Sequence, residues 1–215
     1  MSGCIPLIVP RGRSRKASAD LTGGNADRNS EIFYYDGTDI SQITSSTAGL
    51  STVPSLDNGT IAFESTADLT GDNADGSREI FYYDGLNITQ ITDSDSENSS
   101  DPSLDHGAIA FESRADLTGN NADGSLEIFY YDGSTITQVT DSASEPSLDA
   151  SLDRGVIAFA SEADLTGDNA DGNREIFLAS CQPPAAIPTT NPVGLMMLAL
   201  LLSLAGGLGL RRKAA

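Results

Sequence analysis

The sequence predicts an all-β protein built from a repeated unit, on the basis of its period and its composition. The motif Ala-Asp-Leu-Thr-Gly begins at positions 19, 67, 115 and 163, so the period is 48 residues each time. A fixed period of this length is the signature of a repeat architecture. The repeats lack helical periodicity, and Gly, Asn, Asp and Ser recur too often in them for long helices.

Each repeat is expected to contribute four short strands. Three strand types are rich in β-branched and aromatic residues, which favour sheets, and read Ile-Ala-Phe, Glu-Ile-Phe-Tyr-Tyr and Ile-Thr-Gln-Ile-Thr. Asp84-Gly85 is a tight-turn signal between the second and third types. A fourth, weaker strand is expected through Asp-Pro-Ser-Leu-Asp, as at 101–105.

The Ile-Phe-Tyr-Tyr strand is apolar on both faces, since Ile80 and Tyr82 point one way and Phe81 and Tyr83 the other. Such a strand needs a sheet packed between two others. Small antiparallel sheets stacked radially meet this condition, and one blade of such a stack takes about 40–50 residues. The sequence therefore predicts a partial β-propeller of about three blades over residues 18–180. A two-sheet sandwich is the alternative, but it does not explain the fixed period.

The order of motifs within a repeat also resembles a known family. Residues 102–107 read Pro-Ser-Leu-Asp-His-Gly, and Ile-Ala-Phe, Glu-Ile-Phe and Val-Thr follow at 109–111, 127–129 and 139–140. This order resembles TolB-type propeller repeats, although the family's Trp before the Asp-Gly turn is absent. The resemblance implies a propeller that binds proteins or peptides, or that accompanies a hydrolase domain.

The charge of the repeat region excludes one class of partner. All 31 Asp and Glu lie between residues 18 and 180, with only five basic residues, which leaves this region at −26. A body this acidic has no positive face for phosphates, so we expect no nucleic-acid binding.

The C-terminal end predicts a membrane segment. Residues 193–210 carry no charge, and the length of this segment is about the minimum for a helix that spans a bilayer. The tail 211–215 that follows begins with three basic residues, which favour the cytoplasmic side and place the body beyond the membrane. A Pro-rich linker, 181–192, precedes the span.

The same end resembles bacterial sorting tails of the IPTL-CTERM and PEP-CTERM type. The matching residues are Ile187, Pro188 and Thr189, the apolar helix, and Arg211, Arg212 and Lys213. The family usually has Leu where Thr190 stands here, and a Trp shortly afterwards that is missing. The resemblance implies a sorting enzyme as partner, and a protein held at the bacterial cell envelope or released by tail cleavage.

The N-terminal residues 1–17 do not form a secretory signal, because their apolar piece is broken by Pro6 and Pro10 and followed by basic residues. Together with the incomplete count of blades, this favours a C-terminal fragment of a longer exported protein. The alternative is a tail-anchored protein whose body stays in the cytoplasm.

The acidic loop between the Ile-Ala-Phe and Glu-Ile-Phe strands is a candidate calcium site, because calcium prefers six to eight oxygen ligands. The spacing does not fit an EF-hand, and the alternative is a turn in which Asn and Asp bond the backbone. The candidate ligands in two copies of the loop are Asp72, Asn73, Asp75, Glu79, Asp168, Asn169, Asp171 and Glu175.

No catalytic or other cofactor-binding residues are predicted. His106 is the only histidine and has no nucleophile motif near it, so it is interpreted as a turn residue. We therefore expect a non-enzymatic, envelope-anchored scaffold that binds a protein or a polysaccharide. The alternatives are the non-catalytic propeller part of a hydrolase whose active domain lies upstream, and a calcium-dependent adhesive repeat protein.

Overall fold

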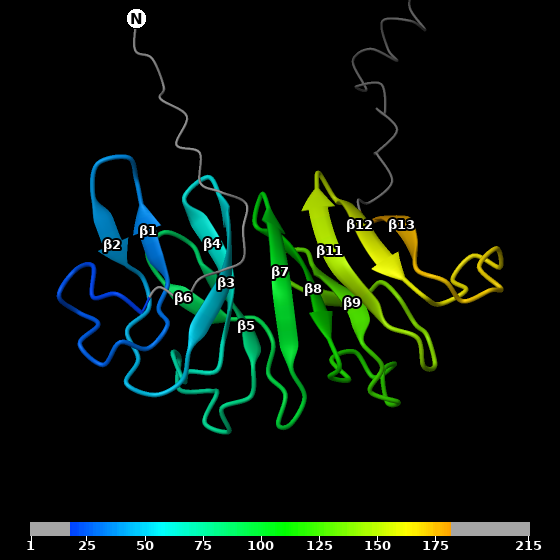
Figure 1. Ribbon diagram of the computed structural model, residues 1–215, viewed down its shortest axis with the longest axis horizontal. Coiled ribbons are helices and arrows are strands. Elements are labelled where there is room, and N and C mark those ends of the chain that lie inside the picture. The colour runs from blue at the N-terminus through cyan, green and yellow to red at the C-terminus, as the bar shows by residue number, and fades with distance from the viewer. Residues whose placement is uncertain (1–17, 182–215) are drawn as a thin grey trace, which may run out of the picture. The chain divides into compact units, whose positions relative to one another are not determined.

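The computed structural model describes residues 18–181, which form thirteen strands in four antiparallel sheets and no helix (Figure 1). The strands are β1 (Phe33–Tyr35), β2 (Ile40–Gln42), β3 (Ser51–Asp57), β4 (Thr60–Ser65), β5 (Glu79–Tyr83), β6 (Ile88–Gln90), β7 (Ser99–Asp105), β8 (Ala108–Ser113), β9 (Glu127–Tyr131), β10 (Ile136–Gln138), β11 (Ser147–Asp153), β12 (Val156–Ser161) and β13 (Glu175–Ser180). All four predicted strand types are present, and the weak one is the longest, at seven residues in each copy.

Two of the sheets are complete blades and two are not. The complete blades have the orders β3-β4-β5-β6 and β7-β8-β9-β10, and they are flanked by the two-stranded sheet β1-β2 and the three-stranded sheet β11-β12-β13. The first and last sheets do not pair with each other, so the described part of the propeller is open. The prediction of a partial propeller of about three blades is confirmed, with the missing strands divided between its two ends.

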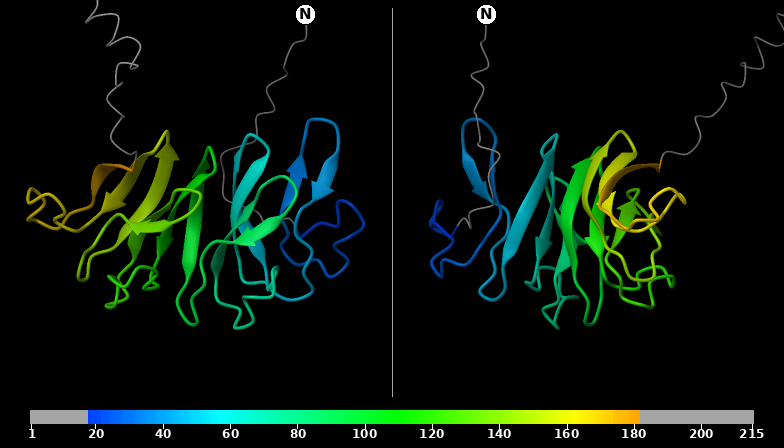
Figure 2. Two further views of the ribbon diagram at one scale, coloured as in Figure 1. Left: turned by 180° about the vertical axis from the view of Figure 1, so that it is seen from behind. Right: turned by 45° about the vertical axis from the view of Figure 1, so that its right-hand side comes forward.

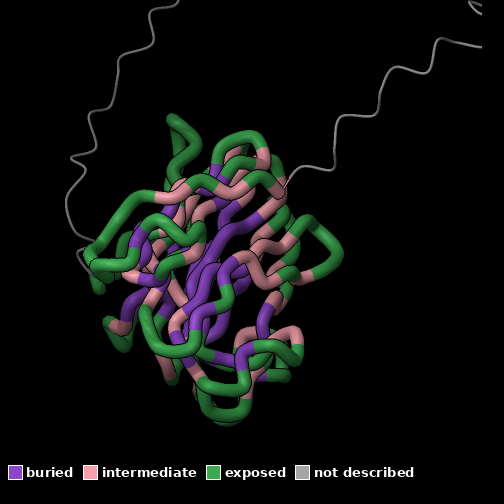
Figure 3. The backbone as a smooth tube through the Cα atoms, turned by 90° about the vertical axis from the view of Figure 1, so that its right-hand side faces the viewer, coloured by how far each residue is buried: buried purple, intermediate pink, exposed green. Residues whose placement is uncertain are grey.

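Successive sheets stack face to face, so that the strands β3, β7 and β11 follow one another from blade to blade (Figures 1 and 2). The interior strands bury both faces, as their sequence predicted. Ile80 packs in one core with Phe111 and Phe129 of the next sheet, whereas Phe81 packs in another with Ile32 of the preceding sheet. Figure 3 shows the buried backbone in the middle of the stack and the exposed loops at its margin.

Hydrogen bonds add to the packing between neighbouring sheets. The backbone N–H of Leu104 donates to Ser55 Oγ of the preceding sheet at 2.9 Å, and that of Leu152 donates to Ser103 Oγ at 2.9 Å. Irregular register at Asp101 frees its N–H from the β7–β8 ladder, and this N–H donates to Glu64 at 3.2 Å. Because hydrogen bonds are directional, these links help to fix how neighbouring blades are aligned.

The last sheet exposes the face that each complete blade buries. Ile176 and Leu178 of β13 are 73% and 74% exposed, whereas Ile80 and Ile128, at the position of Ile176 in the complete blades, are fully buried. The difference follows from the repeat, because residues 18–181 provide no further sheet to cover β13.

Several predictions from sequence fall on residues outside the described range. These are the N-terminal segment 1–17, the linker 181–192 beyond its first residue, the membrane span 193–210 and the basic tail 211–215. Among residues 18–181, no helix is long and apolar enough to cross a bilayer.

Candidate functional site

The acidic loop of the second repeat is organised around the buried side chain of Asn73. Its Nδ2 donates to the Ser77 carbonyl oxygen at 3.0 Å, and its backbone N–H donates to Asp68 Oδ1 at 3.2 Å. Asp68 Oδ1 also accepts the N–H of Gly71 at 2.7 Å. The loop is therefore a compact turn held by Asn and Asp side chains on the backbone, as the architectural interpretation of the sequence expected.

Three of the four calcium candidates in this loop converge on one hydroxyl. Ser77 Oγ lies 3.1 Å from Asn73 Oδ1, 3.2 Å from Asp75 Oδ1 and 2.8 Å from Glu79 Oε1. The fourth candidate, Asp72, is exposed. Ser125 makes the same contacts in the third repeat, to Asn121, Asp123 and Glu127. The oxygens thus gather around a serine, and calcium binding there stays a prediction from sequence.

Glu79, which the sequence offers only as a calcium candidate, also has a structural role. It is fully buried and holds the outer strand of its own blade, because its carboxylate accepts the Thr92 hydroxyl and, at 2.9 Å, the Ser94 N–H. Burial raises the pKa of Glu79, and the hydrogen bonds from Thr92, Ser77 and Ser94 act in the opposite direction. The signal that could have identified this role is the Thr that stands 13 residues after the Glu of the first three Glu-Ile-Phe motifs.

In the last repeat the Glu is open to solvent, unlike Glu79 and Glu127. Asn169 is buried and donates to the Asn173 carbonyl oxygen at 2.9 Å, but Asp168, Asp171 and Glu175 are exposed. Together they line a cavity of about 450 Å³, whose wall consists of Thr166, Asp168, Asn169, Ala170, Asp171, Asn173, Glu175 and Phe177. Four of the eight calcium candidates therefore lie at one cavity, beside the edge strand β13.

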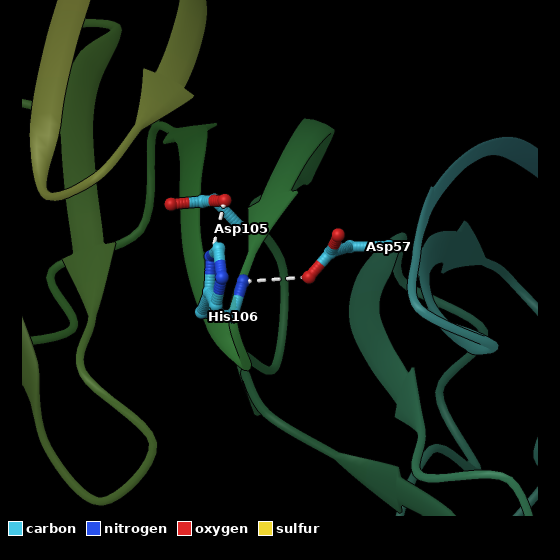
Figure 4. Close-up of side chains that lie close together, drawn as sticks. All are labelled: Asp57, Asp105 and His106. Carbon is cyan, nitrogen blue, oxygen red and sulfur yellow. Dashed lines mark hydrogen bonds and ion pairs between the residues drawn. The ribbon is translucent and has the colours of Figure 1, made fainter.

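A second cluster lies where the β3–β4 turn and the β7–β8 turn approach each other (Figure 4). Asp57, Asp105 and His106 form the one group of three acidic, histidine or cysteine side chains in residues 18–181 whose ligand atoms are close enough to share a metal ion. From the sequence these residues were expected only as parts of separate turns, because Asp57 and His106 are 49 positions apart.

The contacts within this cluster link neighbouring blades. Asp57 Oδ2 accepts the backbone N–H of His106 at 2.9 Å, and Asp105 Oδ2 accepts that of Arg154 at 2.6 Å. The His106 ring lies with Nδ1 2.7 Å from Asp105 Oδ1, and this hydrogen bond raises the pKa of His106. Because both carboxylates accept hydrogen bonds from the turn of the next blade, and Asp105 also holds the His106 ring, the contacts favour a structural role for the cluster.

The predicted sorting residues cannot be placed in this site. Ile187, Pro188, Thr189, Arg211, Arg212 and Lys213 all lie outside the described residues.

Comparisons with known proteins support the fold. No protein-family model and no curated protein sequence matches the chain. Among solved structures, the chain is similar to the β-propeller domain of the Trilobed protease from Pyrococcus furiosus, which has an open velcro topology, with a TM-score of 0.50 and 13% identity over 72% of this chain and 47% of that one. The tricorn protease aligns with a TM-score of 0.31 and 19% identity over 67% of this chain and 14% of that one. The chain thus spans about half the length of the first structure. It has an all-β fold of the β-propeller type.

Proposed function

We propose that this chain is a non-enzymatic, envelope-anchored scaffold that binds a protein or a polysaccharide through its propeller body. One observation supports this proposal most directly. The last sheet presents Ile176 and Leu178 to solvent at 73% and 74% exposure, and the alternate residues Glu175 and Phe177 of the same strand line a polar cavity of about 450 Å³. Large apolar side chains exposed beside polar groups are typical of interaction surfaces.

The charge of the body restricts the partner. With −26 over residues 18–180, the scaffold repels nucleic acids and other polyanions. A neutral polysaccharide or a protein with a basic or apolar surface fits this field. The anchoring part of the proposal rests on the uncharged residues 193–210 and the basic cluster that follows them.

Site-specific photo-crosslinking tests the binding surface. A photoreactive residue replaces Leu178, and the full chain is incubated in mild detergent with purified cell-envelope proteins and polysaccharides. The matched control places the same group at Leu86, which is 87% exposed but lies on an outer turn. We expect one discrete crosslinked product from position 178 and none from position 86. Equal crosslinking at both positions would contradict the proposed surface.

The intact mass of the native protein tests the anchoring. A chain of these 215 residues that keeps its tail has a mass of 22.4 kDa and is recovered with the envelope, whereas a larger envelope-bound species would carry further residues upstream. A shorter species in the culture medium, cut near Ile187–Thr189, would show that the tail is processed by a sorting enzyme. Recovery of the intact chain from the cytosol would contradict the proposal.

A further inference from the structure

The outer strand of a blade is held by a recurring set of contacts. In the second repeat, the Glu79 carboxylate accepts the Thr92 hydroxyl and the Ser94 N–H, and Thr92 Oγ1 in turn accepts the N–H of Ile80 at 2.9 Å. The first and third repeats make the same contacts, from Glu31 to Thr44 and Ser46 and from Glu127 to Thr140 and Ser142.

A second contact holds the last residue of the outer strand. The Thr70 hydroxyl of the acidic loop lies 3.1 Å from Gln90 Oε1, and Gln90 is the cross-strand partner of Phe81. The first and third repeats again match, with Thr22 and Gln42 at 3.0 Å and Thr118 and Gln138 at 3.1 Å. In the first three repeats, a Thr, a Glu and a Phe thus contact or pair with an outer strand. The sequence of this strand is Ile-(Thr/Ser)-Gln-(Ile/Val)-Thr-x-Ser.

The fourth repeat has the selecting residues but no outer strand among residues 18–181. β13 is the edge of its sheet, whose order is β11-β12-β13. Thr166, Glu175 and Phe177 correspond to Thr70, Glu79 and Phe81, and all three line the cavity of about 450 Å³. Glu79 and Glu127 are fully buried under their outer strands, whereas Glu175 is exposed. The cavity therefore lies where the complete blades place their outer strand.

We propose that this cavity and the β13 edge form a strand-addition site, which binds an extended segment of another polypeptide with the pattern Ile-Thr-Gln-(Ile/Val)-Thr-x-Ser. This inference rests on the proposed scaffold function and specifies its ligand. Main-chain hydrogen bonds to β13 supply affinity, and side-chain contacts to Glu175 and Thr166 supply specificity, as in other cases of β-strand addition.

Residues 18–181 do not supply the strand that would occupy this site. The three outer-strand segments of the body, 40–46, 88–94 and 136–142, are each engaged with the Glu of their own repeat. A free edge strand beside a shaped polar cavity is a template for pairing with a further strand.

A labelled synthetic peptide with the sequence of residues 136–142, Ile-Thr-Gln-Val-Thr-Asp-Ser, tests the site. Its fluorescence anisotropy is measured with the full chain in mild detergent. We expect saturable binding. Replacing the second Thr of the peptide by Val should weaken binding about tenfold, because a hydrogen bond to a charged group is lost and the Glu175 carboxylate is left unpaired.

Variants of the protein place the contact. Glu175→Ala should weaken binding of the parent peptide by about the same factor, and the Val peptide should then lose nothing more. The matched control is Glu97→Ala, which removes one exposed carboxylate elsewhere and should bind like the parent. Both variants are checked for an unchanged melting temperature, so that loss of binding is not loss of fold.

Three results would overturn the site. They are the absence of saturable binding, equal binding by the Glu175→Ala and Glu97→Ala variants, and slow hydrogen exchange at the β13 outer-edge amides in the free chain, which would mean that its own tail already covers the edge. If the peptide fails while crosslinking at position 178 succeeds, only the strand-addition site is wrong. If both fail, the proposed scaffold function is wrong as well.

Discussion

Individual backbone positions carry strain that the repeat reveals. The irregular position in the first strand of each complete or near-complete sheet has positive φ, at 50° for Val53, 51° for Asp101 and 59° for Asp149. Asp tolerates this left-handed region, but a β-branched residue there is strained. The sequence did not indicate the strain, because Val is otherwise an ordinary strand residue.

We expect Val53→Asn to stabilise the protein by about 1 kcal/mol, because Asn adopts positive φ at lower cost. Thermal unfolding of the full chain in mild detergent measures the change. The reverse variant, Asp101→Val, should be destabilised by at least as much, since it also disturbs the strand that faces Glu64. An unchanged or lower melting temperature for Val53→Asn would show that the position is not strained.

Glu112 links stability to pH. Burial raises its pKa from 4.5 to about 7, and the neighbouring carboxylates Asp101, Asp149 and Glu64 add to the rise, against the N–H that Asp149 donates. In the equivalent position of the second repeat, Glu64 lies 3.6 Å from Arg78 Nε, but Leu126 stands where the third repeat would place that Arg. Glu112 therefore lacks the cation that its counterpart has.

The sign of the pH effect follows from the raised pKa. Between pH 4.5 and about 7 the folded chain holds the Glu112 proton more tightly than the unfolded chain, so stability falls as the pH rises through this window. The fall amounts to at most about 3 kcal/mol. Glu112→Gln should remove this part of the pH dependence and be more stable than the parent at pH 8. Parallel melting curves against pH for parent and variant would contradict the assignment.

At the scale of the strand, the buried Glu of each repeat is a connection whose removal should unfold one edge of a blade. Glu127 is fully buried and binds Thr140 and Ser142, so Glu127→Ala leaves these partners without their acceptor. We expect a loss of about 2–4 kcal/mol in the free energy of unfolding. Glu175→Ala, at the same position in the last repeat, should cost under about 0.5 kcal/mol because Glu175 is exposed. Denaturant unfolding compares the two, and similar losses would show that the outer strand does not depend on this contact.

The acidic loops allow the calcium prediction to be tested. Asn121 is buried, and its Nδ2 lies 3.0 Å from the Ser125 carbonyl oxygen and 3.2 Å from that of Arg114. Removing the amide in Asn121→Ala leaves these carbonyls unpaired, so we expect a loss of about 1–3 kcal/mol. If the side chain only closes the turn, the loss is the same in calcium and in chelator. A larger loss in calcium, together with a parent that melts earlier in chelator, would instead support calcium binding.

The strands were predictable from sequence because their signals are local. The alternation of Ile80, Phe81, Tyr82 and Tyr83, the Asp-Gly turn and the 48-residue period determine the strands and the two-faced packing of each sheet. The contacts that hold the sheets together are not local. Glu79 contacts Thr92, 13 residues further along the chain, and Asp57 contacts His106, 49 residues further along, so motifs taken one at a time reveal neither pair. Only the recurrence of the Glu-to-Thr spacing in the first three repeats could have indicated the first pair. The cavity at β13 was the hardest feature to predict, since it depends on the last sheet having no outer strand among residues 18–181.

At the scale of the whole molecule, two unlike ends of the stack leave apolar side chains exposed. On the last sheet these are Ile176 and Leu178, and on the first sheet they include Tyr35 and Ile40, at 50% and 46% exposure. In the complete blades the corresponding residues pack against a neighbouring sheet. The two end surfaces are thus of the kind that pack against each other inside the stack, and the acidic charge of the body opposes their meeting between molecules.

These opposing forces predict salt-dependent self-association. Raising NaCl from about 0.05 to 0.5 M shortens the Debye length from roughly 14 to 4 Å, which weakens the repulsion and leaves the apolar attraction. We expect association in mild detergent, measured by sedimentation velocity, to rise several-fold over this range. The double variant Ile176→Ser with Leu178→Ser should reduce association at every salt concentration without lowering the melting temperature, because neither side chain is buried in the single chain.

The control Leu86→Ser removes another exposed Leu from an outer turn and should associate like the parent. An equal effect of the control would assign the association to general hydrophobicity or to the tail, and a lower melting temperature in the double variant would show that the end face is already covered within one chain.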